Sequence, residues 1–138
     1  MAGGDFTNFV SQALSAGGWE PKAGFYRNTT AWWYRQNGAL PDTWAWAWSG
    51  SQNFWHFNNN TGRATRVASY KDMLAGDVLQ IDYSGDGTVD HSAIVVEKTS
   101  SNMYLAQHTI DDARRSYLSM RAKYPNARWH KWHYVYGS

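Results

Sequence analysis

The chain has 138 residues, a length that suits one domain with a hydrophobic core of its own. Hydrophobic residues make up 43% and charged residues 17%, which excludes an intrinsically disordered chain, and the lack of cysteine excludes disulfides and thiolate metal sites. The net charge of +2 comes without a clustered run of Lys and Arg, so no nucleic-acid partner is expected, and no apolar stretch is long enough to span a membrane.

Hydrophobic periodicity and turn residues predict a helix at the start of the chain and mostly strands in its second half. The expected elements are a helix at 5–16, irregular structure at 19–41, a helix from 49 or 51 to 57, an extended segment at 63–69, strands at 77–83, 91–97 and 103–109, a helix at 111–123 and a strand at 129–136. A helix followed by an antiparallel meander is an α+β fold. No linker, repeat or low-complexity tract divides residues 1–138, so we expect one domain.

Capping and turn residues set the expected boundaries. Asp5 is the predicted N-cap of the first helix, and the two glycines at 17–18 end it. Asp111 or Asp112 is expected to cap the last helix. The sequence Ser-Gly-Asp-Gly at 84–87 predicts a tight turn between two strands.

The segment 82–90 also places oxygen-bearing side chains at alternate positions, as a calcium-binding loop does. The candidate ligands are Asp82, Ser84, Asp86 and Asp90. The twelfth position of such a loop would be Ala93, where a bidentate Glu is needed, and the flanking segments have strand patterns. We therefore favour a hairpin turn and expect no metal or other cofactor.

Aromatic residues account for 17% of the chain, with nine Trp and nine Tyr, and many lie between residues 32 and 57. Large rings allow a small core to bury much apolar area per residue, and this is the interpretation that we favour. The alternative is a groove in which the rings stack on carbohydrate or peptide.

Three motifs carry residues suited to chemistry. Residues 4–12 open the first helix, and residues 90–96 begin a strand with His91. Residues 104–109 place Gln107 and His108 on the following strand. His56, His130 and His133 belong to none of these motifs and are expected to be surface or packing residues.

Together the motifs resemble the putative amidase domain of bacteria, a relative of the NlpC-type and CHAP cell-wall peptidases in the papain-like class. The first motif of that family reads Gly-Gly-Asp-Cys-Thr-Asn-Phe-Val-Ser-Gln, and residues 3–12 differ from it only at Phe6. Further matches occur at 16–19, 76–80, 90–92 and 107–109, so the resemblance covers nearly the whole chain. The family's usual lead-in segment before the cysteine motif is expected to be missing here.

The resemblance implies a papain-like, NlpC-type fold in which an N-terminal helix packs on an antiparallel sheet. It also implies a triad in which a cysteine thiolate at a helix N-terminus pairs with an imidazole that a third polar group orients. On this chain Phe6 holds the nucleophile position, His91 is the base and His108 the orienting group, with Gln107 as the alternative. Adjacent strand residues face opposite sides, so only one of these two can point at His91.

Phe6 has no nucleophilic atom, so we expect the chain to be catalytically inactive. The resemblance implies amide hydrolysis in cell-wall peptides for the family, hence a peptide or peptidoglycan-like ligand, a monomer, and a secreted or cell-wall-associated location in bacteria. Two alternatives to an inactivated hydrolase stay open. One is a pseudoenzyme that binds cell-wall peptide or glycan through the old cleft and its aromatic residues. The other is a structural or interaction domain with no small ligand.

Overall fold

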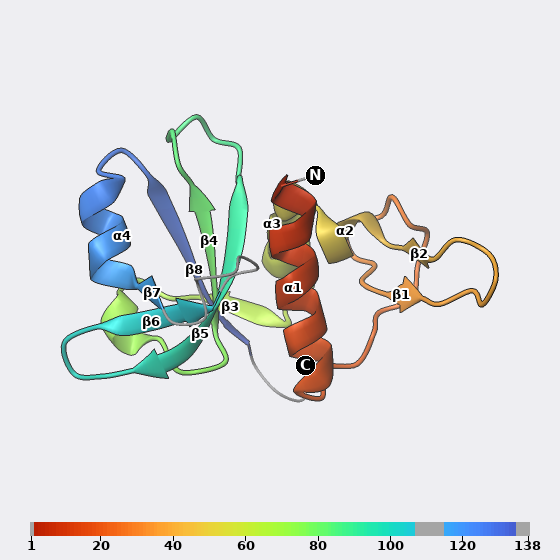
Figure 1. Ribbon diagram of the computed structural model, residues 1–138, viewed down its shortest axis with the longest axis horizontal. Helices are drawn as coiled ribbons and strands as arrows, with labels where there is room; N and C mark the ends of the chain where they lie inside the picture. The colour runs from red at the N-terminus through yellow and green to blue at the C-terminus, as the bar shows by residue number, and fades with distance from the viewer. Residues whose placement is uncertain (1, 107–114, 135–138) are drawn as a thin grey trace.

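A computed structural model describes residues 2–106 and 115–134, and of residues 2–6 it describes the backbone alone (Figure 1). In chain order the elements are α1 (Ala2–Ala16), β1 (Tyr34–Arg35), β2 (Thr43–Trp44), α2 (Trp46–Ser49), α3 (Ser51–Asn60), β3 (Ala64–Arg66), the 3-10 helix η1 (Tyr70–Asp72), β4 (Val78–Asp82), β5 (His91–Lys98), β6 (Met103–Ala106), β7 (Arg115–Ser116), α4 (Tyr117–Lys123) and β8 (Arg128–Tyr134). These helices and the antiparallel sheet confirm the expected α+β class. Among the described helices, none has the length and apolar character needed to cross a bilayer.

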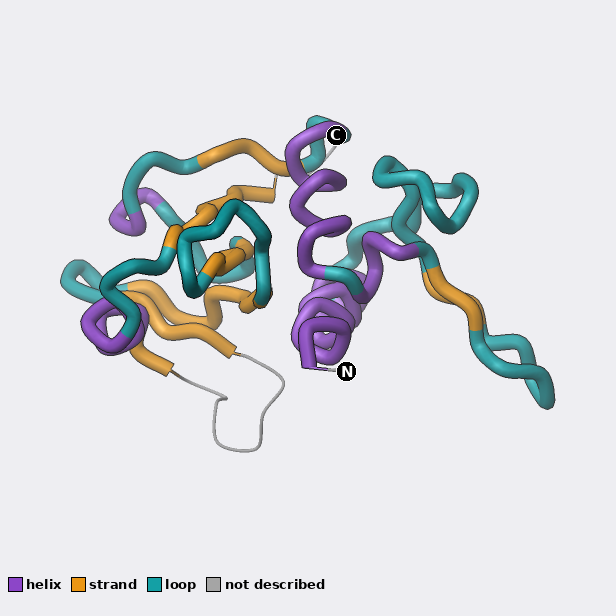
Figure 2. Tube along the Cα trace, turned by 90° about the horizontal axis from the view of Figure 1, so that it is seen from above, coloured by secondary structure: helices purple, strands orange, loops and turns teal. Residues whose placement is uncertain are grey.

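Six strands form one antiparallel sheet in the order β3-β8-β4-β5-β6-β7. The meander from β4 to β7 follows the chain, and β8 returns to lie between β3 and β4. In the pairing of β4 with β5, Gln80 lies opposite Ser92 and Ile81 opposite His91. Strands β1 and β2 pair separately, on the side of α1 away from the large sheet (Figures 1 and 2).

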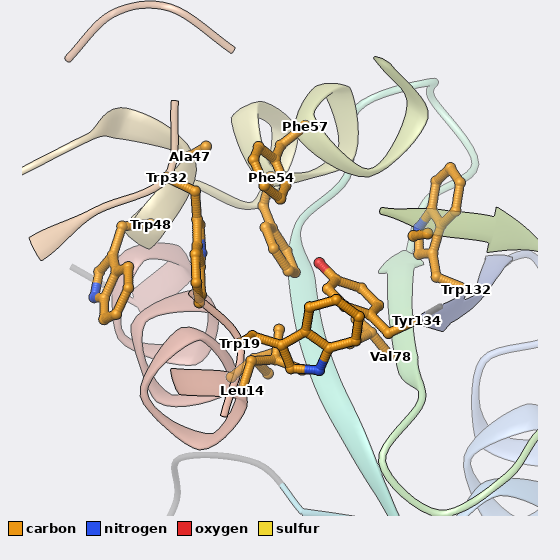
Figure 3. Close-up of a cluster of buried hydrophobic side chains, with 12 residues drawn as sticks. Leu14, Trp19, Trp32, Ala47, Trp48, Phe54, Phe57, Val78, Trp132 and Tyr134 are labelled. Carbon is orange, nitrogen blue, oxygen red and sulfur yellow. The ribbon is translucent and has the colours of Figure 1, made fainter. Parts of the chain in front are cut away.

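The two faces of the large sheet carry two cores. Helices α1 and α3 cover one face, where an aromatic cluster packs that includes Trp19, Trp32 and Phe54 (Figure 3). Helix α4 packs on the other face through Tyr117 and Met120. Every residue of β4 is buried, because this strand lies between the two cores. Large rings do fill the core, as expected, although other aromatic residues of the same stretch are exposed.

Several element boundaries differ from those expected. Asp5 is not an N-cap, because α1 begins at Ala2 and Asp5 lies inside the helix. No Pro interrupts residues 2–5, so the helix can extend through them, at the conformational-entropy cost that the two glycines carry. The end of α1 is as predicted, since Gly18 adopts a φ of 104° and the amide of Trp19 bonds back to the carbonyl of Leu14 at 3.1 Å.

The start of the last helix was also predicted wrongly. Residues Arg115–Ser116 form β7, and the Ser116 side chain caps α4 by accepting a hydrogen bond from the amide of Ser119 at 3.2 Å. Neither Asp111 nor Asp112 caps this helix, and both lie outside the described residues. Pairing with β6 keeps β7 extended, a tertiary effect that helical periodicity does not report.

A buried polar network joins α3 to three strands through Gln80. The Gln80 Nε2 donates to the Ser51 carbonyl at 2.9 Å and to Ser92 Oγ at 3.1 Å. Its Oε1 accepts from Asn58 Nδ2 and from Trp132 Nε1, both at 3.1 Å. All four hydrogen-bonding positions of this fully buried amide are therefore used.

The network reaches α1 and β8 at its two ends. Thr7 Oγ1 lies 2.6 Å from Ser51 Oγ and 3.0 Å from Ser92 Oγ. At the other end the Tyr134 hydroxyl donates to Asn58 Oδ1, and burial raises the pKa of Tyr134 well above its usual value. Helices α1 and α3 are thus fixed to β4, β5 and β8 by directional bonds in addition to apolar packing.

Replacing Gln80 by Met is expected to destabilise the fold by about 3–5 kcal/mol, because the volume is kept but the buried groups of Ser51, Asn58 and Trp132 lose a partner. Urea unfolding followed by circular dichroism measures the loss. The matched control is Gln36→Met at an exposed position, with an expected change of about 0.5 kcal/mol or less. Equal effects of the two substitutions would contradict a stabilising role for the network.

Candidate functional site

The polar residues of the first motif fix α1 in the structure. Asn8 Oδ1 accepts a hydrogen bond from Trp48 Nε1 at 2.8 Å. Ser11 Oγ donates to the Trp48 carbonyl at 2.8 Å and accepts from Trp32 Nε1 at 2.9 Å. These contacts tie α1 to α2 and to the segment before β1. The motif for which the sequence predicted a catalytic role therefore also holds α1 in place.

Thr7 brings the motif at the start of α1 to the motif at the start of β5. Its hydroxyl is fully buried and lies 3.0 Å from Ser92 Oγ. Phe6 and His91 are the chain neighbours that precede these two residues. The two elements begin at the same end of the molecule (Figure 1). The backbone positions of the predicted nucleophile and base are thus held at one junction.

The imidazole of His91 lies on a particular face of the sheet. Side chains alternate along a strand, so His91 and Ser92 project from opposite faces. Ser92 faces α1, whereas the His91 ring packs against Tyr83 with centroids 5.8 Å apart. His91 is 1% exposed. Among the described residues, Thr7 and Ser92 form a direct polar contact between the two motifs.

The position of residue 6 along α1 also differs from the expected one. The helix begins at Ala2, so Phe6 is its fifth residue and lies beyond the first turn. The favourable effect of the helix dipole on an anion falls off within the first turn. A thiolate at position 6 would consequently depend more on a nearby cation than on the dipole. The side chain of Phe6 is outside the described part of the structure.

The two candidates for the orienting group follow directly after β6. The last residue of that strand, Ala106, pairs with Ile94 of β5. Gln107 and His108 lie outside the described residues, so the choice between them stays a prediction.

Gln52 is a residue of this region that sequence reasoning missed. Its Oε1 accepts a hydrogen bond from the amide of Val89 at 2.7 Å, two residues before His91, and its Nε2 lies 3.4 Å from His56 Nε2. The bond spans 37 positions along the chain, and no local pattern could have indicated it. Gln52 thereby fixes the segment that leads into β5 to helix α3.

The segment 82–90 forms the connection between the antiparallel strands β4 and β5, as the hairpin interpretation predicts. The Asp82 carboxylate accepts hydrogen bonds from the amides of Gly85, Asp86 and Gly87 at 2.8–3.3 Å. The Thr88 amide bonds to Asp86, and this bond lowers the pKa of Asp86. Asp90 accepts from the amide of Tyr83 at 3.1 Å.

These carboxylates therefore have a structural role in closing the loop. The described residues, 2–106 and 115–134, contain no group of three or more His, Asp or Glu side chains that could hold a metal ion.

The remaining described histidines make packing contacts. His130 Nδ1 accepts from Trp55 Nε1 at 3.3 Å, and burial lowers the pKa of His130. His133 Nδ1 lies 2.8 Å from Asp77 Oδ1, beside a hollow of about 310 Å³ between the end of α1 and the sheet. Asp77 Oδ2 also accepts from the amide of Leu74, so this carboxylate holds the turn before β4.

Comparison with known proteins agrees with the motifs. An uncharacterized protein of Bacillus subtilis (strain 168), YhbB, is 36% identical to this chain over 135 residues. The alignment covers 94% of the chain and 42% of that relative, so the chain spans less than half of the relative's length. No solved structure matched the chain. Residues 1–132 match the family described as "Putative amidase domain", and the chain belongs to this family.

Proposed function

We propose that this chain is a papain-like, NlpC-type amidase domain whose reaction centre lies where α1 meets β5, and that Phe6 leaves it without a nucleophile. The observation that carries the proposal is the buried contact of Thr7 with Ser92, 3.0 Å between the hydroxyl oxygens. It supports a site at this junction because residues 6 and 91 immediately precede the two partners.

The chemistry of such a site requires three groups. A cysteine at position 6 would attack the amide carbonyl as a thiolate, and His91 would hold the thiol's proton and deliver it to the leaving amine. A water molecule, deprotonated by His91, would then hydrolyse the resulting thioester and restore the thiol, while a polar group orients the imidazole. His91 is the first residue of β5, so its ring can meet residue 6 only around the end of that strand. His108 or Gln107 would supply the orienting group.

The substrates that we propose are amide bonds of cell-wall peptides. We also propose that the protein is a monomer and that it is secreted or associated with the cell wall. A binding domain without hydrolysis is the second candidate function. The observation in its favour is Phe6 itself, because every other residue of the motif at 3–12 agrees with the family pattern.

The unchanged chain is expected to release no amines from purified peptidoglycan, whereas its Phe6→Cys variant should release them. Loss of the nucleophile from such a unit lowers the rate by a factor on the order of 10⁴ or more. Phe6→Ala is the matched control, because it removes the ring without supplying a thiol, and it should stay inactive. Turnover by the unchanged chain that disappears in His91→Ala would show that another nucleophile operates.

The thiol of Phe6→Cys should react with iodoacetamide at pH 6 faster than free cysteine does. An imidazolium beside the thiol favours the thiolate, so a larger fraction is ionised at that pH. His91→Ala in the same background should remove the excess rate. Equal rates with and without His91, both matching free cysteine, would show that residue 6 is not beside His91.

His108→Ala in the Phe6→Cys background should reduce amine release by a larger factor than Gln107→Ala does, because we expect the orienting group to be His108. Measuring kcat on peptidoglycan for the two variants side by side tests this. The opposite ranking would assign the role to Gln107.

A further inference from the structure

A second concave feature lies away from the junction of α1 and β5. This aromatic hollow has a volume of about 420 Å³ and is lined by Tyr26, Trp33, Asp42, Thr43, Trp44 and Trp46. It is built on the paired strands β1 and β2 and the start of α2, across α1 from the large sheet (Figures 1 and 2). Its size is in the range of small-molecule sites.

The rings of the aromatic hollow are exposed yet held in place. Trp44 and Trp46 are 39% and 43% exposed. Trp44 stacks on Tyr34 with an interplanar angle of 6°, and Trp33 Nε1 donates to the Gly24 carbonyl at 2.9 Å. A ligand would therefore meet rings that are already ordered, which lowers the entropic cost of binding.

Two guanidinium groups already lie over rings that line the hollow. Arg27 lies over Tyr26 and Trp46, 5.4 and 5.2 Å from their centroids, and Arg35 lies 5.1 Å from that of Trp33. Neither arginine lines the hollow itself. Their charges disfavour a further organic cation at this site.

Asp42 is the charged residue in the lining, and it disfavours an anionic ligand such as a phosphate or a nucleic acid. Its carboxylate accepts hydrogen bonds from the Tyr34 hydroxyl at 2.5 Å and from the Asn37 amide at 3.4 Å. A carboxylate has about four acceptor positions, so capacity for ligand hydroxyls remains. The mixed charges around the hollow thus favour a neutral ligand that offers hydroxyl groups.

We propose that the aromatic hollow binds a neutral saccharide. The C–H groups of a pyranose ring carry partial positive charge and fit the negative face of an indole such as that of Trp44. The hydroxyl groups would bond to Asp42 and Thr43. The proposal goes beyond the amidase chemistry, because it concerns a ligand held away from residues 6 and 91.

The test is a titration of the unchanged chain with chitotetraose and, separately, with cellotetraose, followed by NMR of the tryptophan indole N–H groups. The indole signals of Trp33, Trp44 and Trp46 should shift, whereas that of the buried Trp132 should not. This mapping uses the unaltered protein, so it does not depend on the folding of any variant. Two tetrasaccharides are used because the proposed contacts would recognise a pyranose ring and not particular substituents on it.

Trp44→Ala should weaken binding of the tetrasaccharide about tenfold, the loss expected when one aromatic stacking contact is removed. Leu40→Ala is the matched control, because Leu40 is 70% exposed between β1 and β2 but outside the lining, and it should leave the affinity unchanged. Asp42→Asn distinguishes the two ligand classes. It should weaken saccharide binding by a smaller factor than Trp44→Ala does, and it should weaken binding of a cation by a larger factor than Trp44→Ala does.

The proposal would be overturned if the chain bound neither tetrasaccharide, or if Trp44→Ala left the affinity unchanged. Binding of choline in place of the saccharides, lost in Asp42→Asn, would overturn it in favour of an organic-cation site. None of these measurements uses residue 6 or His91, so their failure would leave the proposed reaction centre untouched.

Discussion

The side-chain amide of Gln80 is the interaction on which the rest of the structure depends. It lies on the central part of the sheet, fully buried, and its four hydrogen bonds reach α3, β5 and β8. Leaving one group of this buried amide without a partner costs about 1–3 kcal/mol, which favours the formation of all of its contacts together. That requirement selects one register of the strands and one position of α3, because a shift of one residue would move Gln80 to the opposite face.

The same network links the fold to the proposed chemistry. Ser51 and Ser92, both bonded to Gln80, also hold the hydroxyl of Thr7, so the position of α1 follows from the position of β4. The residues next to position 6 thus hold α1 in its place, whereas the residue at position 6 would take part in the proposed reaction. Under the proposed function, this division would allow the contacts of residues 7–12 to persist while residue 6 changes.

The sequence predicted most strands and the first helix, because β4, β5 and β8 combine strand-forming residues with turn residues at their ends. It did not predict the short elements β1, β2 and α2, whose two to four residues are too few to show a period. For the candidate site, the motifs indicated which segments meet. The face from which His91 projects and the role of Gln52 could not be predicted, because both depend on pairing and contacts between distant segments.

The tryptophans between residues 32 and 48 divide into two sets, and this division connects the aromatic hollow to α1. Trp32 and Trp48 are buried, and their indole N–H groups bond to Ser11 and Asn8 of α1. Trp33 directly follows Trp32, and Trp46 lies two residues before Trp48; both line the hollow. Because one set is bonded to the helix and the other faces the ligand, the hollow is fixed relative to α1. A saccharide held there would consequently keep a defined position with respect to residue 6, although the two sites bind through separate groups.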